Sequence, residues 1–477
     1  MSKNPAFLGF IKSAVIVACI LLPLGVNAQY LRTSYFMDGA QYRMQLNPAL
    51  APERGYIHIP VVGNTSAMIR SNALNVSDIF DLLKNASDDD YYTTDKFYNR
   101  LQDQNKAFAT MASDLFAVGT WQGNSFMSFN ISMRADGNLS VARELFTFMR
   151  DMKGMNTNDY SDYTRSIGGN RMNFNVYTEI GFGYTRIIND RWTIGGRLKG
   201  LLGLGNVDFK VNNAVINTRL QGIDPNIDWT TAGPDELMDA TGTATIDVDA
   251  DLVTTFHGLD LITNSDGYID DVKFKMGKMG VSGLGAAIDA GLAFDVTPDF
   301  TLSAAVTDLG FIRWAKGSTR VAHANTQDLN FDAENPGDLM RFTSVVGTGE
   351  ALNMDMARLT IDDQGAKART TSIASTMSLG GEYRLMEDKI RLGALFTNHF
   401  ARLENESELT FSVDYHASSL VDLAVSYSPI MCGGQSLGLA VKAGPLFVGT
   451  DYLYMGNNSR CLNALVGLSI PLGKREE

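Results

Sequence analysis

Three kinds of feature are scarce in this chain of 477 residues. It has 3 cysteines, no uninterrupted apolar run of transmembrane-helix length after residue 28, and 40 Lys and Arg against 53 Asp and Glu. The acidic balance argues against nucleic acid or another polyanion as a partner, because such partners need clustered basic residues. The missing apolar runs exclude a bundle of transmembrane helices, each of which needs about 20 such residues.

The N-terminus has the features of a secretory signal peptide. Lys3 and Lys12 accompany an apolar run over residues 14–24, and small residues lead to a cleavage site after Ala28. We therefore predict that residues 1–28 are removed on export, which changes the formal charge from −13 to −15 because two lysines are lost. Lipid attachment at Cys19 stays open as an alternative.

Short segments that alternate apolar and polar residues dominate the chain from Thr371 to its C-terminus. In residues 407–416, Phe411 and Val413 fall on one face and Ser412 and Asp414 on the other. A strand places alternate side chains on opposite faces of a sheet, so one face is apolar and the other polar. This pattern, repeated in segment after segment, is typical of an all-β protein that forms a transmembrane antiparallel β-barrel in an outer membrane.

The alternating segments indicate about 14 strands, an even number as closed single-chain barrels of this kind require. We expect an N-terminal segment with short helices over residues 29–110 and the barrel over 111–477. Long extracellular loops are expected over 251–280 and 315–370. Short turns alternate with these and other longer connections, which places the C-terminus on the periplasmic side. A further helix is expected over residues 139–151.

Charged residues of both signs share the polar face of the predicted strands. On the lipid face each Arg or Lys near the bilayer midplane would cost about 2–4 kcal/mol, so these residues are expected to face the lumen. Salt bridges among them would stiffen the wall or hold a plug. The main candidates are Glu382, Arg384, Arg391, Glu408, Asp414, Asp422 and Lys442.

Three short motifs resemble the long-chain fatty-acid transporter (FadL-like) superfamily. They are the Asn47-Pro48-Ala49 segment near the mature N-terminus, the Thr307-Asp308-Leu309-Gly310 segment after 285–291, and the 380–385 segment before 390–393. The resemblance implies a barrel channel whose N-terminal segment folds into the lumen as a plug, with Asn47, Pro48 and Ala49 as the plug motif. The chain departs from that pattern at its C-terminus, which ends Lys474-Arg475-Glu476-Glu477 with no terminal aromatic residue.

Cys432 and Cys461 are the two cysteines of the mature chain, and they match no zinc motif. Both are expected at the extracellular rim. In an oxidising compartment such a pair is interpreted as a disulfide, with two unpaired thiols as the alternative. A bridge that closes a loop of roughly 30 residues would contribute about 3 kcal/mol on the chain-entropy estimate.

Catalytic and metal-binding patterns are mostly missing. The five histidines have no ligand spacing, and the chain has no nucleophile elbow, phosphate-binding loop or dinucleotide fingerprint. Residues 264–271 look like the middle of a calcium loop, but Ile262 and Lys273 stand where ligands would be required, which favours a turn. A cation at Asp247, Asp249 and Asp251 stays open. We therefore expect no enzyme, no cofactor and no metal site.

Two functions of different classes fit these features. The first is an outer-membrane channel for passive uptake of small hydrophobic or amphipathic molecules, as the resemblance implies. The alternative is a scaffold or secretion-accessory barrel that transports nothing and binds partner proteins through its extracellular loops, above all 315–370. A barrel enzyme is the third and weakest possibility. The expected partners are outer-membrane lipid, a small hydrophobic ligand and a protein at the loops, in a Gram-negative cell.

Overall fold

A computed structural model describes most of the chain after the predicted signal peptide, which itself lies outside the described residues. The described ranges are 31–60, 62–85, 89–154, 161–224, 239–326, 329–335, 337–338, 358–402, 405–431, 434–453 and 460–475.

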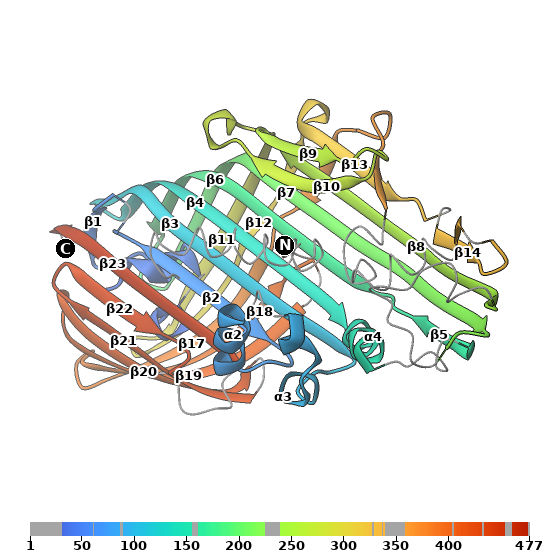
Figure 1. Ribbon diagram of the computed structural model, residues 1–477. Coiled ribbons are helices and arrows are strands. Elements are labelled where there is room, and N and C mark those ends of the chain that lie inside the picture. The colour runs from blue at the N-terminus through green and yellow to red at the C-terminus, as the bar shows by residue number, and fades with distance from the viewer. Residues whose placement is uncertain are drawn as a thin grey trace.

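Antiparallel strands close into a barrel with 14 positions in its wall, as the sequence predicts. The last strand, β23, pairs with β22 on one side and with β1 and β2 on the other, and β1 and β2 in turn pair with β3. The long tilted strands β3, β4, β6 and β7 lie side by side (Figure 1). The wall comprises β1 (Arg54–His58) with β2 (Thr65–Ser71), β3 (Gln104–Gln122), β4 (Ser125–Ala142), β6 (Asn170–Ile187), β7 (Trp192–Gln221), β11 (Gly283–Thr297), β12 (Phe300–Trp314), β17 (Ser375–Leu385), β18 (Ile390–Phe400), β19 (Asn405–Ser418), β20 (Val421–Met431), β21 (Gly434–Ala443), β22 (Leu446–Thr450) and β23 (Cys461–Lys474).

The two faces of the wall differ in the way a membrane barrel requires. Large apolar side chains such as Leu198, Phe411 and Leu423 are exposed on the outer face, while Asp414 and Asp422 are fully buried on the other. Exposed apolar residues occur on nearly every wall strand, so they form a continuous belt. A belt of this kind around a closed barrel is covered by lipid in a bilayer.

Six short connections lie at the end of the barrel where the chain finishes. Each joins two neighbouring wall strands through two to four residues, and β1 starts at this same end, because Arg54 pairs with Lys474. The connections are residues 123–124, 188–191, 298–299, 386–389, 419–420 and 444–445.

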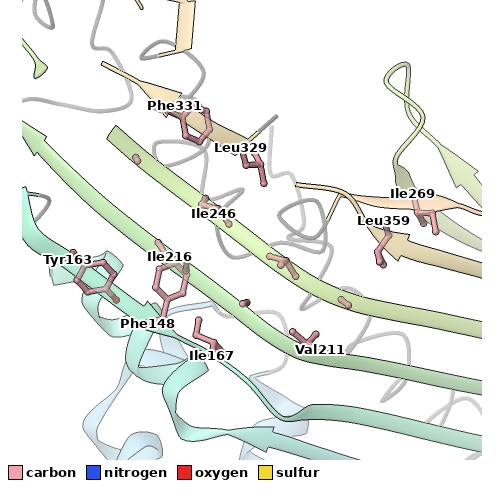
Figure 2. Packing of buried hydrophobic residues seen from close by; sticks show 14 of the residues in the cluster. Phe148, Tyr163, Ile167, Val211, Ile216, Ile246, Ile269, Leu329, Phe331 and Leu359 are labelled. Carbon is pink, nitrogen blue, oxygen red and sulfur yellow. The ribbon is translucent and has the colours of Figure 1, made fainter. Parts of the chain in front are cut away.

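At the opposite end the sheet continues beyond the belt as an extension. One edge of β7 pairs with β11 over residues 192–203 and then with β8 over residues 205–221. Apolar residues on one face of this hairpin, including Phe209, Ile216 and Ile246, are buried together with Phe148 and Tyr163 (Figure 2). The extension comprises β5 (Tyr163–Ser166), β8 (Thr241–Phe256), β13 (Thr319–Ala324), β14 (Asn330–Asp332), β15 (Leu359–Ile361), β16 (Arg369–Ser372) and the separate hairpin of β9 (Leu259–Thr263) and β10 (Ile269–Phe274).

The helices are short, and among the residues that the structure describes none is long and apolar enough to cross a membrane. The longest is α4, which follows β4 directly and begins four residues later than the helix expected over 139–151. Rings from α3, α4 and the preceding turn pack together, with Phe97 against Phe146 at 5.2 Å. The helices are α2 (Val76–Lys84), α3 (Asp95–Tyr98), α4 (Arg143–Gly154) and the 3-10 turns η2 (Arg32–Ser34), η3 (Gln41–Gln45), η4 (Asp89–Thr93), η7 (Met276–Lys278) and η8 (Lys316–Ser318).

The pairings correct two boundaries drawn from the sequence. The wall begins at Arg54 and not at residue 111, because β1 and β2 pair with β23 and β3. Parts of the expected loops 251–280 and 315–370 form strands, namely the end of β8, the β9–β10 hairpin and β13 through β16. Residues 327–328, 336 and 339–357 of the second loop lie outside the described residues. Pro60 interrupts the alternation of apolar and polar residues between β1 and β2, which hides the start of the wall. The short strands within 251–280 and 315–370 lack a clear period of two, so the sequence does not show them.

Candidate functional site

The segment over residues 31–53 lies inside the barrel, against the inner face of the wall. The Thr33 amide and hydroxyl both donate to Asp451, at 2.8 and 2.7 Å, next to β22. The Tyr35 hydroxyl lies 2.9 Å from that of Ser303 on β12, and the Thr185 hydroxyl of β6 donates to the Pro48 carbonyl at 2.6 Å. Because these strands are far apart around the wall, the segment crosses the lumen between them.

The Asn47-Pro48-Ala49 motif is fixed at one side of this crossing. Asn47 is fully buried, and its amide nitrogen donates to the Tyr35 hydroxyl at 3.1 Å and to the Leu292 carbonyl at 3.5 Å. Its side-chain oxygen accepts from the Ala49 amide at 3.0 Å, which closes a local turn. The motif therefore joins the segment to β6 and β11 through both its side chain and its backbone.

Ion pairs also join the segment to the wall. Arg32 contacts Glu408 on β19 and lies 3.7 Å from Asp451. Asp38 pairs with Arg391 of β18 at 2.6 Å. Since both partners of each pair are largely buried, loss of one partner would leave a charge without compensation.

Glu53 ties the end of the segment to the wall near the short connections. Its carboxylate lies 3.3 Å from the His416 ring and 3.5 Å from the Lys474 amine. The hydrogen bond from His416, which outweighs partial burial, lowers the pKa of Glu53 to about 2. Glu53 is therefore ionised at neutral pH and holds this contact.

The seven charged residues expected to face the lumen lie on the face opposite the exposed apolar belt. Asp422 accepts from the Gly39 amide at 3.2 Å, and Lys442 donates to the Ser419 carbonyl at 2.8 Å. Arg384 donates to Glu382 at 3.1 Å. Arg391 and Glu408 bind the segment as described above, and Asp414 is fully buried on β19.

A second charge cluster lies on the inner face of β4, β6, β7, β11 and β12. Lys199 is fully buried and lies 2.7 Å from Asp289 and 2.5 Å from Asp308. Glu179 contacts Arg134 at 2.8 Å and Arg197 at 3.5 Å. These five strands are thereby cross-linked by charge.

Glu179, Arg197 and Lys199 also alternate with apolar residues in the sequence, but nothing in the sequence connects them to Asp289 and Asp308. Both aspartates belong to the second of the three motifs that carry the family resemblance, Asp289 to residues 285–291 and Asp308 to the segment that follows. The Asp308 amide donates to Asp289 at 2.7 Å, and Asp308 adopts a φ of 59° where the pairing of β11 and β12 shifts register. An aspartate tolerates this left-handed conformation better than most residues, which explains its place before Leu309-Gly310.

The wall strand formed by β1 and β2 is interrupted near its middle. His58 pairs with Ser469 and Thr65 with Val466 of β23, so six residues of one strand stand opposite only two of the other. On the other side, β3 carries a bulge between Asp114 and Phe116. The regular pairing of the wall is therefore broken locally between β23 and β3. Backbone hydrogen bonds from Ile59 to Leu468 and from Leu468 to Val62, at 3.0 and 2.9 Å, still bridge this break.

A cavity of about 20 Å³, room for roughly one water, lies beside this break between the segment and the wall. Stacked rings border it: Tyr56 lies 4.7 Å and Tyr42 5.8 Å from the His58 ring. Its other lining is partly charged. The lining residues are Gln41, Tyr42, Met44, Gln45, Tyr56, His58, Asp114, Ala117, Ser128, Phe129, Asn130, Arg134 and Arg197.

His58 was interpreted from the sequence as an ordinary surface or lumen histidine, but it is buried in this cavity wall. Its Nδ1 atom lies 2.9 Å from Asp114, which also accepts from Ser132 at 2.6 Å and Asn64 at 3.0 Å. Ser132 donates to the carboxylate and not to the ring, so the three side chains do not form a nucleophile and base. Their role here is to brace the wall beside its break.

The remaining sequence candidates are dispersed. Cys461 is buried at the start of β23, and Cys432 lies outside the described residues, so their disulfide stays a prediction. Within the described part of the chain, no group of three or more His, Cys, Asp or Glu is placed to hold a metal ion. Asn264 caps the β9–β10 turn by accepting from the amides of Asp266 and Tyr268, both at 3.0 Å. Asp251 pairs with His323.

Comparison with known proteins gives a family and several similar folds. A family model described as "Family of unknown function (DUF5723)" matches residues 48–451. No curated protein matches the sequence. The chain is similar to the TodX deltaS2S3 mutant monoaromatic hydrocarbon channel, at 8% identity and a TM-score of 0.42, over 94% of this chain and 96% of that chain.

Two further similar structures come from named organisms. One is the P. putida toluene transporter TodX, at 8% identity and a TM-score of 0.38, over 91% of this chain and 94% of that chain. The other is a Pseudomonas aeruginosa FadL homologue, at 10% identity and a TM-score of 0.35, over 93% and 95%.

Proposed function

The chain belongs to the family of unknown function DUF5723, and we propose that it is an outer-membrane channel for passive uptake of small hydrophobic or amphipathic molecules. The break between β1 and β2, with the cavity behind it, is the observation that carries this proposal. In this proposal the end with the short connections and the C-terminus faces the periplasm. Residues 31–53 act as a plug in the lumen.

The position of the break supports a sideways route. The plug occupies the lumen through its contacts with strands all around the wall, so a straight path along the barrel axis meets protein. The break lies in the wall itself, where lipid would cover the neighbouring strands, and a few backbone hydrogen bonds bridge it, such as that from Leu468 to Val62. An apolar molecule that leaves by this route stays out of water, which is the favourable path for it.

The cavity has room for only about one water, so it supports the proposal through the side chains beside the break and not through its volume. Tyr42 and Tyr56 contribute aromatic rings to the lining, and Gln41, Asn130 and Arg197 contribute polar groups. Pockets for small ligands combine apolar walls with a few placed polar groups in this way. No energy source enters this account, because flow down a concentration gradient needs none.

Uptake by a deletion strain that carries either the wild-type gene or a variant tests the proposal. Ala117 lines the cavity, and Ala117→Phe should fill it and reduce uptake of apolar solutes several-fold. Thr120→Phe is the matched control, because Thr120 is exposed on the same strand. Unchanged uptake in the deletion strain across fatty acids and aromatic hydrocarbons would contradict the channel.

A scaffold is the second candidate, and the extension is the observation that favours it. Residues from the 315–370 region form β13, β14 and β15, which build a folded surface on β8 outside the belt. A protein partner could bind there without any transport. Recovery of a stoichiometric partner from detergent-solubilised membranes, together with unchanged solute uptake, would support the scaffold over the channel.

A further inference from the structure

A ring of glycines faces the 31–53 segment from half of the wall positions. At each of these glycines an added Cβ would come closer than 3.0 Å to an atom of the segment. Real Cβ atoms essentially never make such contacts, so only glycine leaves room for the segment. The glycines are Gly195 on β7, Gly291 on β11, Gly380 on β17, Gly393 on β18, Gly438 on β21, Gly449 on β22 and Gly467 on β23.

Neighbouring glycines that point away from the segment are not crowded in this way. A Cβ on Gly196 would lie 3.5 Å from its nearest neighbour, and one on Gly381 would lie 3.7 Å away, which are ordinary contacts. Each of these two residues directly follows a crowded glycine on the same strand. Other strand glycines, such as Gly181, Gly205 and Gly310, are crowded by side chains of neighbouring strands, so what sets the seven apart is that the crowding atoms belong to residues 31–53.

Backbone geometry does not explain the seven glycines. None of them is among the glycines with positive φ, which lie in turns and connections or at irregular positions near strand ends. Glycine inside a strand costs roughly 0.5–1 kcal/mol relative to alanine, because it loses more conformational freedom on folding. We therefore attribute these glycines to the space that the segment needs, which offsets the cost on each of the seven strands.

We propose that these seven glycines are seats that set the register of residues 31–53 on the wall and thereby seal the axial path. The proposal rests on the proposed plug and adds the wall residues that position it. The strongest seat is at Gly195, which faces the backbone carbonyl of Pro48 and the Ala49 nitrogen. Backbone atoms cannot rotate away, and Thr185 holds the same carbonyl in place.

Seats that face side chains should yield more easily. Gly393 lies under the Phe36 ring and Gly449 under the Leu31 side chain, both of which can change rotamer. A methyl group at Gly195 must instead lift the segment off β7. The seats therefore rank by what they face, with Gly195 before Gly393.

Single-channel conductance of the purified full chain in planar bilayers tests this ranking without any transported substrate. Gly195→Ala should raise the conductance several-fold, because the displaced segment leaves an aqueous path through a polar lumen. Gly196→Ala is the matched control and should conduct like the wild type. Wild-type conductance of a folded Gly195→Ala protein would overturn the proposal.

A compensating pair keeps the test decisive if Gly195→Ala does not fold, as judged by heat-modifiable gel migration. Gly393→Ala should raise conductance above the wild-type value, and adding Phe36→Ala should return it toward that value by removing the ring that clashes. Failure of that rescue, or no increase with Gly393→Ala alone, would overturn the seats. If the conductance results hold but deletion of the gene leaves solute uptake unchanged, only the proposed channel is contradicted.

Discussion

Two parts of β7 carry the same alternation of side chains and have opposite exposure. In the lower part, paired with β11, the outward residues Ile194 and Leu198 are 48% and 68% exposed. In the upper part, paired with β8, the apolar residues Phe209 and Ile216 are 5% and 4% exposed. The change occurs where β7 changes partner, at the register shift near Gly203.

What covers the apolar face explains the difference. Above the shift, α4, β5 and residues such as Leu329 and Leu359 pack on it (Figure 2). Below the shift, the described protein leaves that face open, as it does on the neighbouring wall strands. Apolar surface needs cover from water in both places, so we infer that lipid covers the lower part and protein the upper part.

The inner charges of the lower part should respond most strongly to mutation. Lys199→Met leaves the buried Asp289 and Asp308 without their shared cation, and removing one partner of such a cluster costs about 3–5 kcal/mol. Lys210→Met in the extension is the matched control, because Lys210 is only partly buried, and should cost less than about 0.5 kcal/mol. Urea unfolding in detergent, followed by heat-modifiable migration, measures both. Equal effects would show that Lys199 is not needed to neutralise the cluster.

Truncation of apolar residues should destabilise the protein more in the upper part of β7 than in the lower part, the reverse of the charge substitutions. Phe209→Ala leaves a cavity in the packed face of the extension and should lower the free energy of unfolding by about 3–5 kcal/mol. Leu198→Ala should cost less than half of that, since lipid chains rearrange to fill the space. The same unfolding experiment, in lipid vesicles, compares them. A larger loss at Leu198 would contradict the assignment of lipid to that face.

The smallest effect concerns Glu53, at the end of the 31–53 segment. Because the pKa of Glu53 is depressed when the protein is folded, its contribution is present above the ordinary value near 4.5 and is lost as pH falls toward 2. Glu53 is only half-buried, so solvent screening limits the contribution to less than about 1 kcal/mol. Glu53→Gln should flatten the pH dependence of stability between those values. An unchanged profile would show that Glu53 does not hold this contact.

The sequence predicts the barrel well because a period of two is a local signal that each strand carries independently. Alternation around Phe411 and Val413 needs no knowledge of the neighbouring strand, and the strand number follows from repeated segments. The part of β7 that pairs with β8 carries the same alternation, so the sequence alone cannot tell a lipid-covered face from a protein-covered one. That distinction depends on α4 and on segments near Leu359, which are distant in the chain.

The site was harder to predict for a related reason. Asn47 and Pro48 stand out as a motif, yet their contacts with β6, β7 and β11 join residues more than 130 positions apart. The break between β1 and β2 has a local sign in Pro60, but its meaning depends on the register with β23. Inward glycines such as Gly195 look like any glycine in a strand until the segment that faces them is known.

The boundary on β7 can be tested directly with the wild-type protein. Vesicles that contain a lipid with a photoreactive group in its acyl chain are illuminated, and labelled residues are mapped by mass spectrometry. The account predicts adducts on Ile194 and Leu198 and none on Phe209 and Ile216. Labels on the upper pair, or an unlabelled lower pair, would contradict a lipid-covered belt that ends at the register shift near Gly203.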